Sequence, residues 1–170
     1  RADFAERCIT AHAASKTFNI AGLATSSVII PNGEMRARFE GYVHSLEVDL
    51  GNIFGKIATK AAMEKGEEWL EQLLCYLKGN IDYAVEYLRA EMPRVRVHKP
   101  QATYMLWLDF SSYNLSNKEL NEKMVFGAGV GMNNGIEFGV EGESCLRMNL
   151  ACPRSVIESA LRRIRKAFGE

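Results

Sequence analysis

The sequence has no surplus of charge, no membrane-length apolar run and no repeated or low-complexity segment. Its 21 basic and 21 acidic residues cancel to a formal net charge of +0, which gives no indication of a nucleic-acid or membrane partner. Because a signal-peptide pattern and a long apolar run are both missing, we expect a cytoplasmic protein that does not span a membrane. The remaining composition, with 47% hydrophobic and 25% charged residues, is that of an ordinary globular protein.

Metal-ligand spacing is also missing from the four cysteines. Cys8, Cys75, Cys145 and Cys152 form no C-x-x-C pair and no cysteine–histidine pattern, so the sequence predicts no metal site. Such thiols stay free in a reducing compartment, and cysteine is one of the residue types most often buried. We therefore expect four free and mostly buried cysteines.

Apolar residues recur every three to four positions over much of the chain, which predicts several helices. Helices are expected at residues 34–46, 53–65, 67–92 and 116–127, and a last one begins at Pro153. Short strands are expected at residues 8–11, 27–30, 95–97, 104–110 and 146–150. Asn133-Asn134-Gly135 is typical of a tight turn. The chain is therefore predicted to be α/β, with an α+β small domain in which helices pack on a small mixed or antiparallel sheet.

The long helix at residues 67–92 carries one apolar stripe, which indicates a side that faces a core. Its members are Trp69, Leu73, Leu77, Ile81, Ala84, Val85 and Leu88. Gly79 is expected to weaken this helix midway, at a cost of about 1 kcal/mol relative to alanine. Asn52 and Ser116 are expected to cap the helices that follow them, Ser116 in a capping box with Glu119.

One lysine stands among small and apolar residues between two β-prone segments, in the run Ala13-Ala14-Ser15-Lys16-Thr17-Phe18-Asn19-Ile20-Ala21-Gly22-Leu23. An ammonium group in such surroundings loses hydration, which favours a neutral, nucleophilic amine. A Schiff-base lysine requires such an amine. The alternative is a lysine at a strand end that directs its ammonium into water, which is the commoner situation.

Four segments, in order and at plausible spacing, carry a resemblance to a known family. They are residues 15–23, Gly51-Asn52-Ile53-Phe54-Gly55, residues 102–109 and Cys145-Leu146-Arg147-Met148-Asn149-Leu150-Ala151-Cys152-Pro153-Arg154. The chain resembles fold-type I pyridoxal-phosphate (PLP) enzymes of the class I/II aminotransferase superfamily, and within them the MalY/PatB-type cystathionine β-lyases, or C–S lyases. The resemblance implies the C-terminal part of a longer enzyme. Residues 1–50 would end the large PLP-binding domain, residues 51–92 would form interdomain helices, and residues 93–170 would form the C-terminal small domain.

By this resemblance, Lys16 is the catalytic lysine that forms a Schiff base with PLP, and Arg147 binds the substrate α-carboxylate. Arg147 alternates with apolar neighbours on its predicted strand, so it should face away from them. Its planar fork suits a carboxylate. The alternative is an edge arginine that pairs with a local glutamate such as Glu141 or Glu143.

The resemblance also has departures. Many aminotransferases have a phosphate-binding serine and an arginine at the positions of Ala13 and Ala24. This difference leaves Ser15 as a candidate contact for the cofactor phosphate. Ile53 stands where the family usually has proline, in a loop that approaches the neighbouring subunit. The resemblance further implies PLP as the cofactor, an amino-acid substrate and a homodimer.

Three functions are consistent with these residues. The first is a PLP-dependent C–S β-lyase, which converts cystathionine or a cysteine S-conjugate to pyruvate, ammonia and a thiol. The second is an aminotransferase that uses the same lysine and arginine. The third is a non-catalytic dimerisation or regulatory fragment.

Overall fold

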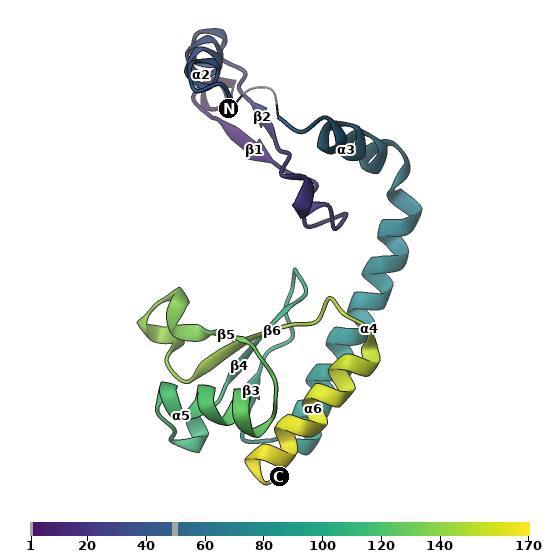
Figure 1. The fold of residues 1–170 in the computed structure, drawn as a ribbon, viewed down its shortest axis with the longest axis vertical. Coiled ribbons are helices and arrows are strands. Elements are labelled where there is room, and N and C mark those ends of the chain that lie inside the picture. Colours follow the sequence, from purple (N-terminus) through teal and green to yellow (C-terminus); the bar gives the residue numbers. More distant parts are fainter. Residues whose placement is uncertain (1, 49–50) are drawn as a thin grey trace. The chain divides into compact units, whose positions relative to one another are not determined.

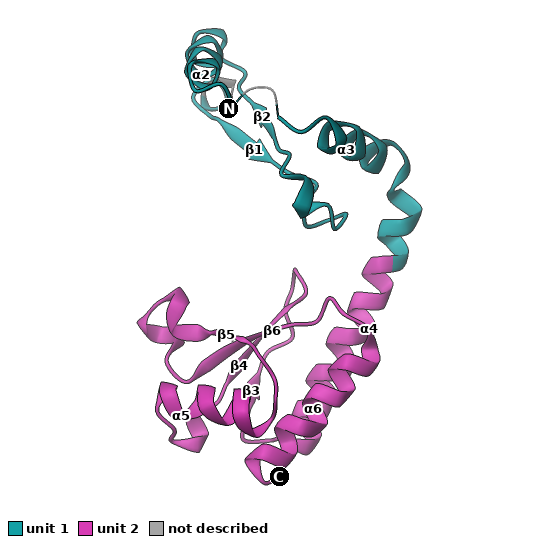
Figure 2. Ribbon diagram, in the orientation of Figure 1, with its two compact units in different colours: residues 1–72 teal, residues 73–170 magenta. Residues whose placement is uncertain are grey.

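The computed structural model describes residues 2–48 and 51–170. The chain divides into two units, residues 1–72 and 73–170, each with a small sheet of its own (Figure 1, Figure 2). Helix α4 (Glu67–Glu91) begins in the first unit and ends in the second.

The first unit contains a two-stranded antiparallel sheet and several helices. Its elements are α1 (Ala2–Ala5), β1 (Thr10–His12), β2 (Ser27–Ile29), α2 (Gly33–Ser45) and α3 (Ile53–Lys65). Thr10 of β1 pairs with Ile29 of β2. The strand expected at residues 8–11 begins two residues later, because the backbone N–H of Cys8 still donates to the carbonyl of Ala5 in the turn after α1 (3.1 Å).

An asparagine caps the N-terminus of each of the helices α2 and α3. The side chain of Asn32 accepts a hydrogen bond from the backbone N–H of Met35 (2.9 Å). That of Asn52 accepts one from Phe54 (3.0 Å), which confirms the predicted cap. The apolar residues of α2 form no core within the described residues, since Tyr42 is 67% exposed and no residue of the helix is buried.

The second unit is built on a four-stranded antiparallel sheet in the order β3-β4-β6-β5. Its strands are β3 (Arg96–Val97), β4 (Met105–Asp109), β5 (Asn133–Asn134) and β6 (Cys145–Asn149). Of the two sheet types that the sequence left open, the structure has the antiparallel one.

The segment predicted to be a tight turn is instead the edge strand β5. Asn133 and Asn134 pair with Arg147 and Leu146 of β6, and a 3₁₀ helix, Gly135–Phe138, follows them. The turn prediction is wrong because pairing with a strand distant in sequence extends both asparagines. This pairing places Asn133 beside Arg147.

One face of the sheet forms the core of the second unit. Leu106 of β4 lies opposite Met148 of β6, and Leu108 lies opposite Leu146; all four are buried. Helices α4 and α6 (Arg154–Phe168) cover this face (Figure 1). Their buried apolar residues in this core are Ile81, Ala84, Val85, Leu88, Ile157, Ala160, Leu161, Ile164 and Phe168. Burial of each large aliphatic side chain contributes about 1.5–3 kcal/mol, so this layer stabilises the unit.

The apolar stripe of α4 is buried only from Leu77 onward. Leu77 and Leu88 are buried as predicted, whereas Trp69 is 47% exposed. Gly79 does not interrupt the helix. A β-carbon at this position would lie 3.2 Å from Nη2 of Arg154, so the glycine leaves room for that guanidinium.

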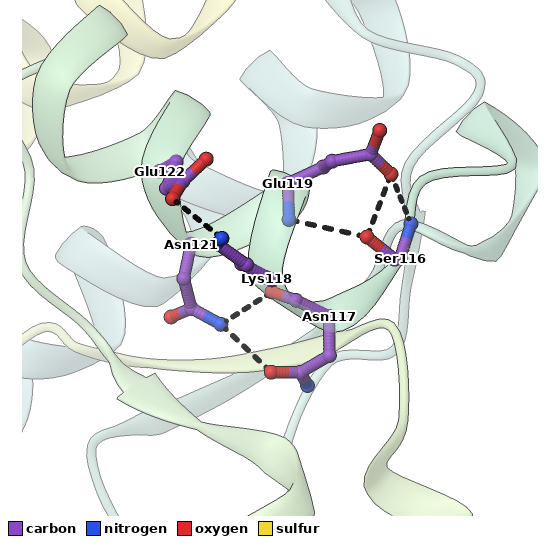
Figure 3. Close-up of polar contacts among 6 residues, drawn as sticks. All are labelled: Ser116, Asn117, Lys118, Glu119, Asn121 and Glu122. Carbon is purple, nitrogen blue, oxygen red and sulfur yellow. Dashed lines mark hydrogen bonds and ion pairs between the residues drawn. The ribbon is translucent and has the colours of Figure 1, made fainter.

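Helix α5 (Asn117–Glu122) begins with the predicted capping box (Figure 3). The Ser116 hydroxyl accepts a hydrogen bond from the backbone N–H of Glu119 (3.3 Å), and the Glu119 carboxylate accepts one from the backbone N–H of Ser116 (2.9 Å). The Ser116 hydroxyl also donates to the Glu119 carboxylate (2.6 Å), and this bond, followed by the one from the backbone N–H, lowers the pKa of Glu119 below its usual value. A π-helical turn, Lys123–Gly127, continues the helix to the predicted end.

All four cysteines are free, but only Cys145 is buried, and Cys75 is exposed. The expectation of mostly buried thiols is therefore wrong; Cys75 lies on α4 outside its buried stripe. Within the described residues, no group of three or more histidine, cysteine or acidic side chains is arranged to hold a metal. None of the helices in residues 2–48 and 51–170 is long and apolar enough to cross a bilayer.

Asn80 is a fully buried polar residue that joins α4 to the turn after β6. Its amide donates to the carbonyls of Leu150 and Cys152 (3.0 Å each), and its oxygen accepts from Nε of Arg154 (2.9 Å). Asn80→Ala would leave these groups without partners. We therefore expect the free energy of unfolding to fall by about 2–4 kcal/mol, measured by urea denaturation.

Asn149→Ala is the matched control for this substitution. Asn149 is exposed, and within the described part of the chain its side chain accepts one local hydrogen bond, from the backbone N–H of Ala151 (2.8 Å). Its replacement should cost about 1 kcal/mol or less. Equal losses in the two variants would show that the buried amide of Asn80 has no special role.

Candidate active site

Lys16 lies in a turn between β1 and β2. The backbone N–H of Phe18 donates to the carbonyl of Ala14 and that of Ile20 to the carbonyl of Ser15, both at 3.0 Å, so the segment folds back on itself. Ala14 is buried, whereas Lys16 is exposed. The described residues of this chain therefore leave the Lys16 side chain in solvent and do not form the dry surroundings that the sequence predicts for it.

Residues later in the first unit anchor this turn. The Phe18 ring stacks on Trp69, with ring centroids 6.0 Å apart. Gly66 lies against the same ring, and a β-carbon there would clash with it. Asn52, the cap of α3, donates from its side-chain amide to the carbonyl of Leu23 (3.1 Å). These contacts fix the lysine segment to α3 and to the first turn of α4.

Hydroxyl groups stand on both sides of the lysine. Ser15 is half-buried and Thr17 is exposed. Ala13 and Ala24 offer no polar side chain, so Ser15 remains the candidate phosphate contact in this segment. A primary amine between two hydroxyl groups offers the chemical groups that a ligand with an aldehyde and a phosphate would contact.

Arg147 lies on the sheet face opposite the core of the second unit. Strand β6 runs between β4 and β5, so Arg147 is not on an edge strand, and Trp107 of β4 lies opposite it. Its two neighbours on β6 are buried, which confirms the predicted alternation. The alternative pairing is wrong, since Arg147 forms no ion pair with Glu141 or Glu143 in the described structure.

Among the described residues, two side chains contact the guanidinium of Arg147. Its Nη2 donates to Oδ1 of Asn133 on β5 (3.0 Å), and its Cζ lies 4.5 Å from the centre of the Phe138 ring. That ring meets Trp107 edge-on, with centroids 5.7 Å apart. Nε of Arg147 is buried and has no hydrogen-bond partner among the described residues. Because a guanidinium has five N–H donors, those left over can bind a carboxylate.

The loop that carries Phe138 depends on two glycines. Gly135 and Gly142 are both buried, and a β-carbon on either one would clash with the backbone of the other. Their close approach closes the loop between them. Any larger residue at either position would push the two backbones apart and move the Phe138 ring.

Asn133 and Phe138 are site residues that sequence patterns did not reveal. The Asn-Asn-Gly sequence is typical of a turn, so it hid the strand that carries Asn133. Strand alternation located Arg147, but finding its neighbours also requires the register of β5 on β6. Phe138 lies in a 3₁₀ helix, whose short length leaves no periodic signal.

Cys145 lies on β6 two residues before Arg147 and pairs with Asp109. Burial, together with the charge of Asp109, raises the pKa of the Cys145 thiol. Partial burial opposes ionisation of Asp109, but hydrogen bonds from Ser111 and the charge of Arg96 hold the pKa of that carboxyl below its usual value. A protonated thiol is a weak nucleophile, so Cys145 is not an activated group beside Arg147.

No family model matches the chain. Cystathionine β-lyase PatB of Bacillus subtilis (strain 168) is 40% identical to it over 166 residues, which are 98% of this chain and 43% of PatB. The chain is homologous to part of the PatB-type cystathionine β-lyases. It spans less than half of the length of PatB, and the match includes both units.

Solved structures agree with this relationship to PatB-type lyases. A PLP-bound protein from Clostridium difficile 630, provisionally classed as an aminotransferase, matches with a TM-score of 0.94 at 42% identity, over 99% of this chain and 43% of that one. Cystalysin from Treponema denticola, which contains PLP, matches with a TM-score of 0.91 at 30% identity, over 99% and 43% of the two chains. Both units therefore have the fold of part of a fold-type I PLP enzyme.

Proposed function

We propose that this chain is the C-terminal part of a PLP-dependent C–S β-lyase, which cleaves cystathionine or a related cysteine S-conjugate to pyruvate, ammonia and a thiol. The longer protein is called the full-length enzyme below. The observation that carries the proposal is Arg147, which lies on the sheet face opposite the core with its Nη2 bonded to the neutral Asn133, in a chain homologous to a cystathionine β-lyase.

The residues present suit PLP. When bound, PLP draws electrons from the substrate Cα and so weakens the Cα–H bond. Lys16 offers the exposed amine that would hold the cofactor covalently, and Ser15 offers a hydroxyl for its phosphate. Because the chain spans 43% of PatB, further cofactor contacts would come from the rest of the full-length enzyme.

Lys16 and Arg147 have separate tasks in this proposal. Arg147 binds the α-carboxylate through parallel N–H···O hydrogen bonds and so fixes the amino acid in one orientation. The Lys16 amine would accept the proton from Cα. The thiolate would then leave the adjacent β-carbon and take up a proton, and water would hydrolyse the resulting enamine to pyruvate and ammonia. Arginine could not replace Lys16, because its guanidinium stays protonated.

The proposal extends to the organisation of the full-length enzyme. Residues 1–50 would end its large PLP-binding domain, residues 51–92 would be interdomain helices, and residues 93–170 would be the small domain. We also propose a cytoplasmic homodimer that acts on an amino acid and binds neither nucleic acid nor a membrane. The balanced charge supports the absence of a nucleic-acid or membrane partner. Exposed apolar side chains on α3, such as Phe54 (72% exposed), support a dimer interface.

Incubation of the full-length enzyme with cystathionine alone tests the reaction. We expect equal amounts of pyruvate, ammonia and homocysteine, because β-elimination needs no acceptor for the amino group. A coupled lactate dehydrogenase assay measures the pyruvate. As the control, addition of 2-oxoglutarate should leave the rate unchanged.

Turnover that requires the added keto acid would instead identify an aminotransferase, the class provisionally given to the Clostridium difficile protein. Neither activity would appear if the protein were a non-catalytic dimerisation or regulatory module. An absorbance scan of this chain with PLP then reports whether it holds the cofactor.

A further inference from the structure

Asn133 contacts the guanidinium of Arg147 from the neighbouring strand. The two residues lie opposite each other in the register of β5 and β6, and Oδ1 of Asn133 accepts a hydrogen bond from Nη2 of Arg147 (3.0 Å). We propose that Asn133 is a positioning residue that orients Arg147 for the substrate carboxylate, and that Asn134 and Asn117 hold it in place. The inference rests on the proposed function, in which Arg147 binds that carboxylate.

A neutral amide suits this task better than an acidic side chain. Asn133 takes up one of the five N–H groups of Arg147 and leaves its positive charge uncompensated. An acidic residue in the same place would form an ion pair and compete with the substrate. Within the described residues, Asn133 occupies one N–H of Nη2. The positive charge and the other terminal N–H groups of the guanidinium are therefore left for an incoming carboxylate.

Phe138 adds a second restraint on the same guanidinium. The hydrogen bond to Asn133 limits rotation of the group within its plane, and the Phe138 ring, 4.5 Å from Cζ of Arg147, limits tilting out of that plane. Trp107 meets the ring edge-on and holds it there. A binding group restrained in this way loses little freedom when its ligand arrives.

Strand β5 is two residues long, so its pairing with β6 requires further support. Asn134 and Asn117 of α5 exchange side-chain hydrogen bonds in both directions, at 2.8 and 2.7 Å. Asn121 donates to the carbonyl and to Oδ1 of Asn117 (2.8 and 3.1 Å), as Figure 3 shows. This amide chain, Asn121–Asn117–Asn134, ties the edge strand to α5 directly beside the residue that touches Arg147.

Substitutions of Asn133 in the full-length enzyme with PLP bound test the inference. Asn133→Ala should raise KM for cystathionine about tenfold and change kcat by less than about threefold, because Asn133 orients a binding group and not the reacting atoms. Asn133→Asp should raise KM about 100-fold, since its carboxylate would pair with Arg147 and exclude the substrate. Asn134→Ala should raise KM about threefold by loosening β5.

Ser116→Ala is the matched control. It removes the cap of α5 and should lower the melting temperature, but it removes none of the asparagine side chains that form the amide chain or contact Arg147. Its KM should stay within about twofold of the unsubstituted enzyme. An equal rise of KM in Ser116→Ala and Asn133→Ala would overturn the inference, because it would indicate general loosening. An unchanged KM in both Asn133 variants would overturn it as well.

A second measurement separates this inference from the proposed function. Nuclear magnetic resonance on this chain reports rotation about the Nε–Cζ bond of Arg147, which should become faster in Asn133→Ala and stay unchanged in Ser116→Ala. Equal rotation with and without Asn133 would overturn the inference, whatever reaction the enzyme catalyses. A full-length enzyme that performs neither elimination nor transamination would refute the proposed function alone, since the rotation result would still stand.

Discussion

Lys16→Ala in the full-length enzyme should abolish pyruvate formation from cystathionine. Alanine removes both the amine that would hold PLP and the base that accepts the Cα proton, and loss of such a base alone costs about 10²–10⁴-fold in rate. The visible absorbance band of the lysine-bound cofactor should disappear with it. Lys16→Arg should be inactive too, because arginine stays protonated. The coupled assay and an absorbance scan measure both effects.

Lys60→Ala is the matched control for Lys16. Lys60 is an exposed lysine of the same unit and pairs with Glu64 one helical turn away (3.9 Å). Such a surface pair contributes about 0.5 kcal/mol or less, so activity and absorbance should remain. Full activity in Lys16→Ala would refute its assignment as the catalytic lysine.

Arg147→Ala should raise KM for cystathionine about 100-fold, since a bidentate, charged contact with the α-carboxylate would be lost. Arg147→Lys should recover only part of this loss, because an ammonium group is a point charge and cannot reproduce the planar fork. Steady-state kinetics with cystathionine as the varied substrate measure both variants.

Arg96→Ala controls for removal of a positive charge from the same sheet. Arg96 is largely exposed and lies 3.8 Å from Asp109, a type of pair that contributes about 1 kcal/mol or less. Its KM should be unchanged. If Arg147→Ala also left KM unchanged, Arg147 would not be the carboxylate-binding residue.

Helix positions could be predicted from the sequence because their signals are local. Asn52 and Ser116 bond to backbone groups two or three residues away, so each cap is visible in a few consecutive letters. Strand β5 could not be predicted in this way. Asn133 is extended by pairing with Arg147, fourteen residues later, and the local turn signal of Asn-Asn-Gly opposes that pairing.

The candidate site, like the fold, was predictable only where its signals are local in the sequence. Lys16 and Arg147 stood out through the family resemblance, and the alternation of β6 gave the side that Arg147 faces. Asn133 and Phe138 depend on the register of β5 and on the close approach of two loop glycines, which arise only in the folded unit. The dry surroundings expected for Lys16 stay a prediction, because the described residues alone leave its side chain exposed and a run of small residues can form an exposed turn as readily as a buried one.

Core-facing and outward-facing side chains alternate along β6. The register that places the Arg147 guanidinium outside the core therefore also buries the apolar side chains that stabilise the second unit. A slip of β6 by a single residue would turn Arg147 into the aliphatic layer and would turn Leu146 and Met148 out into water. Burial of an unpaired cation and loss of two aliphatic contacts would together cost several kcal/mol, by the order of magnitude of each. Misregistered molecules should therefore fail to fold, so that every folded copy presents its arginine on the correct side.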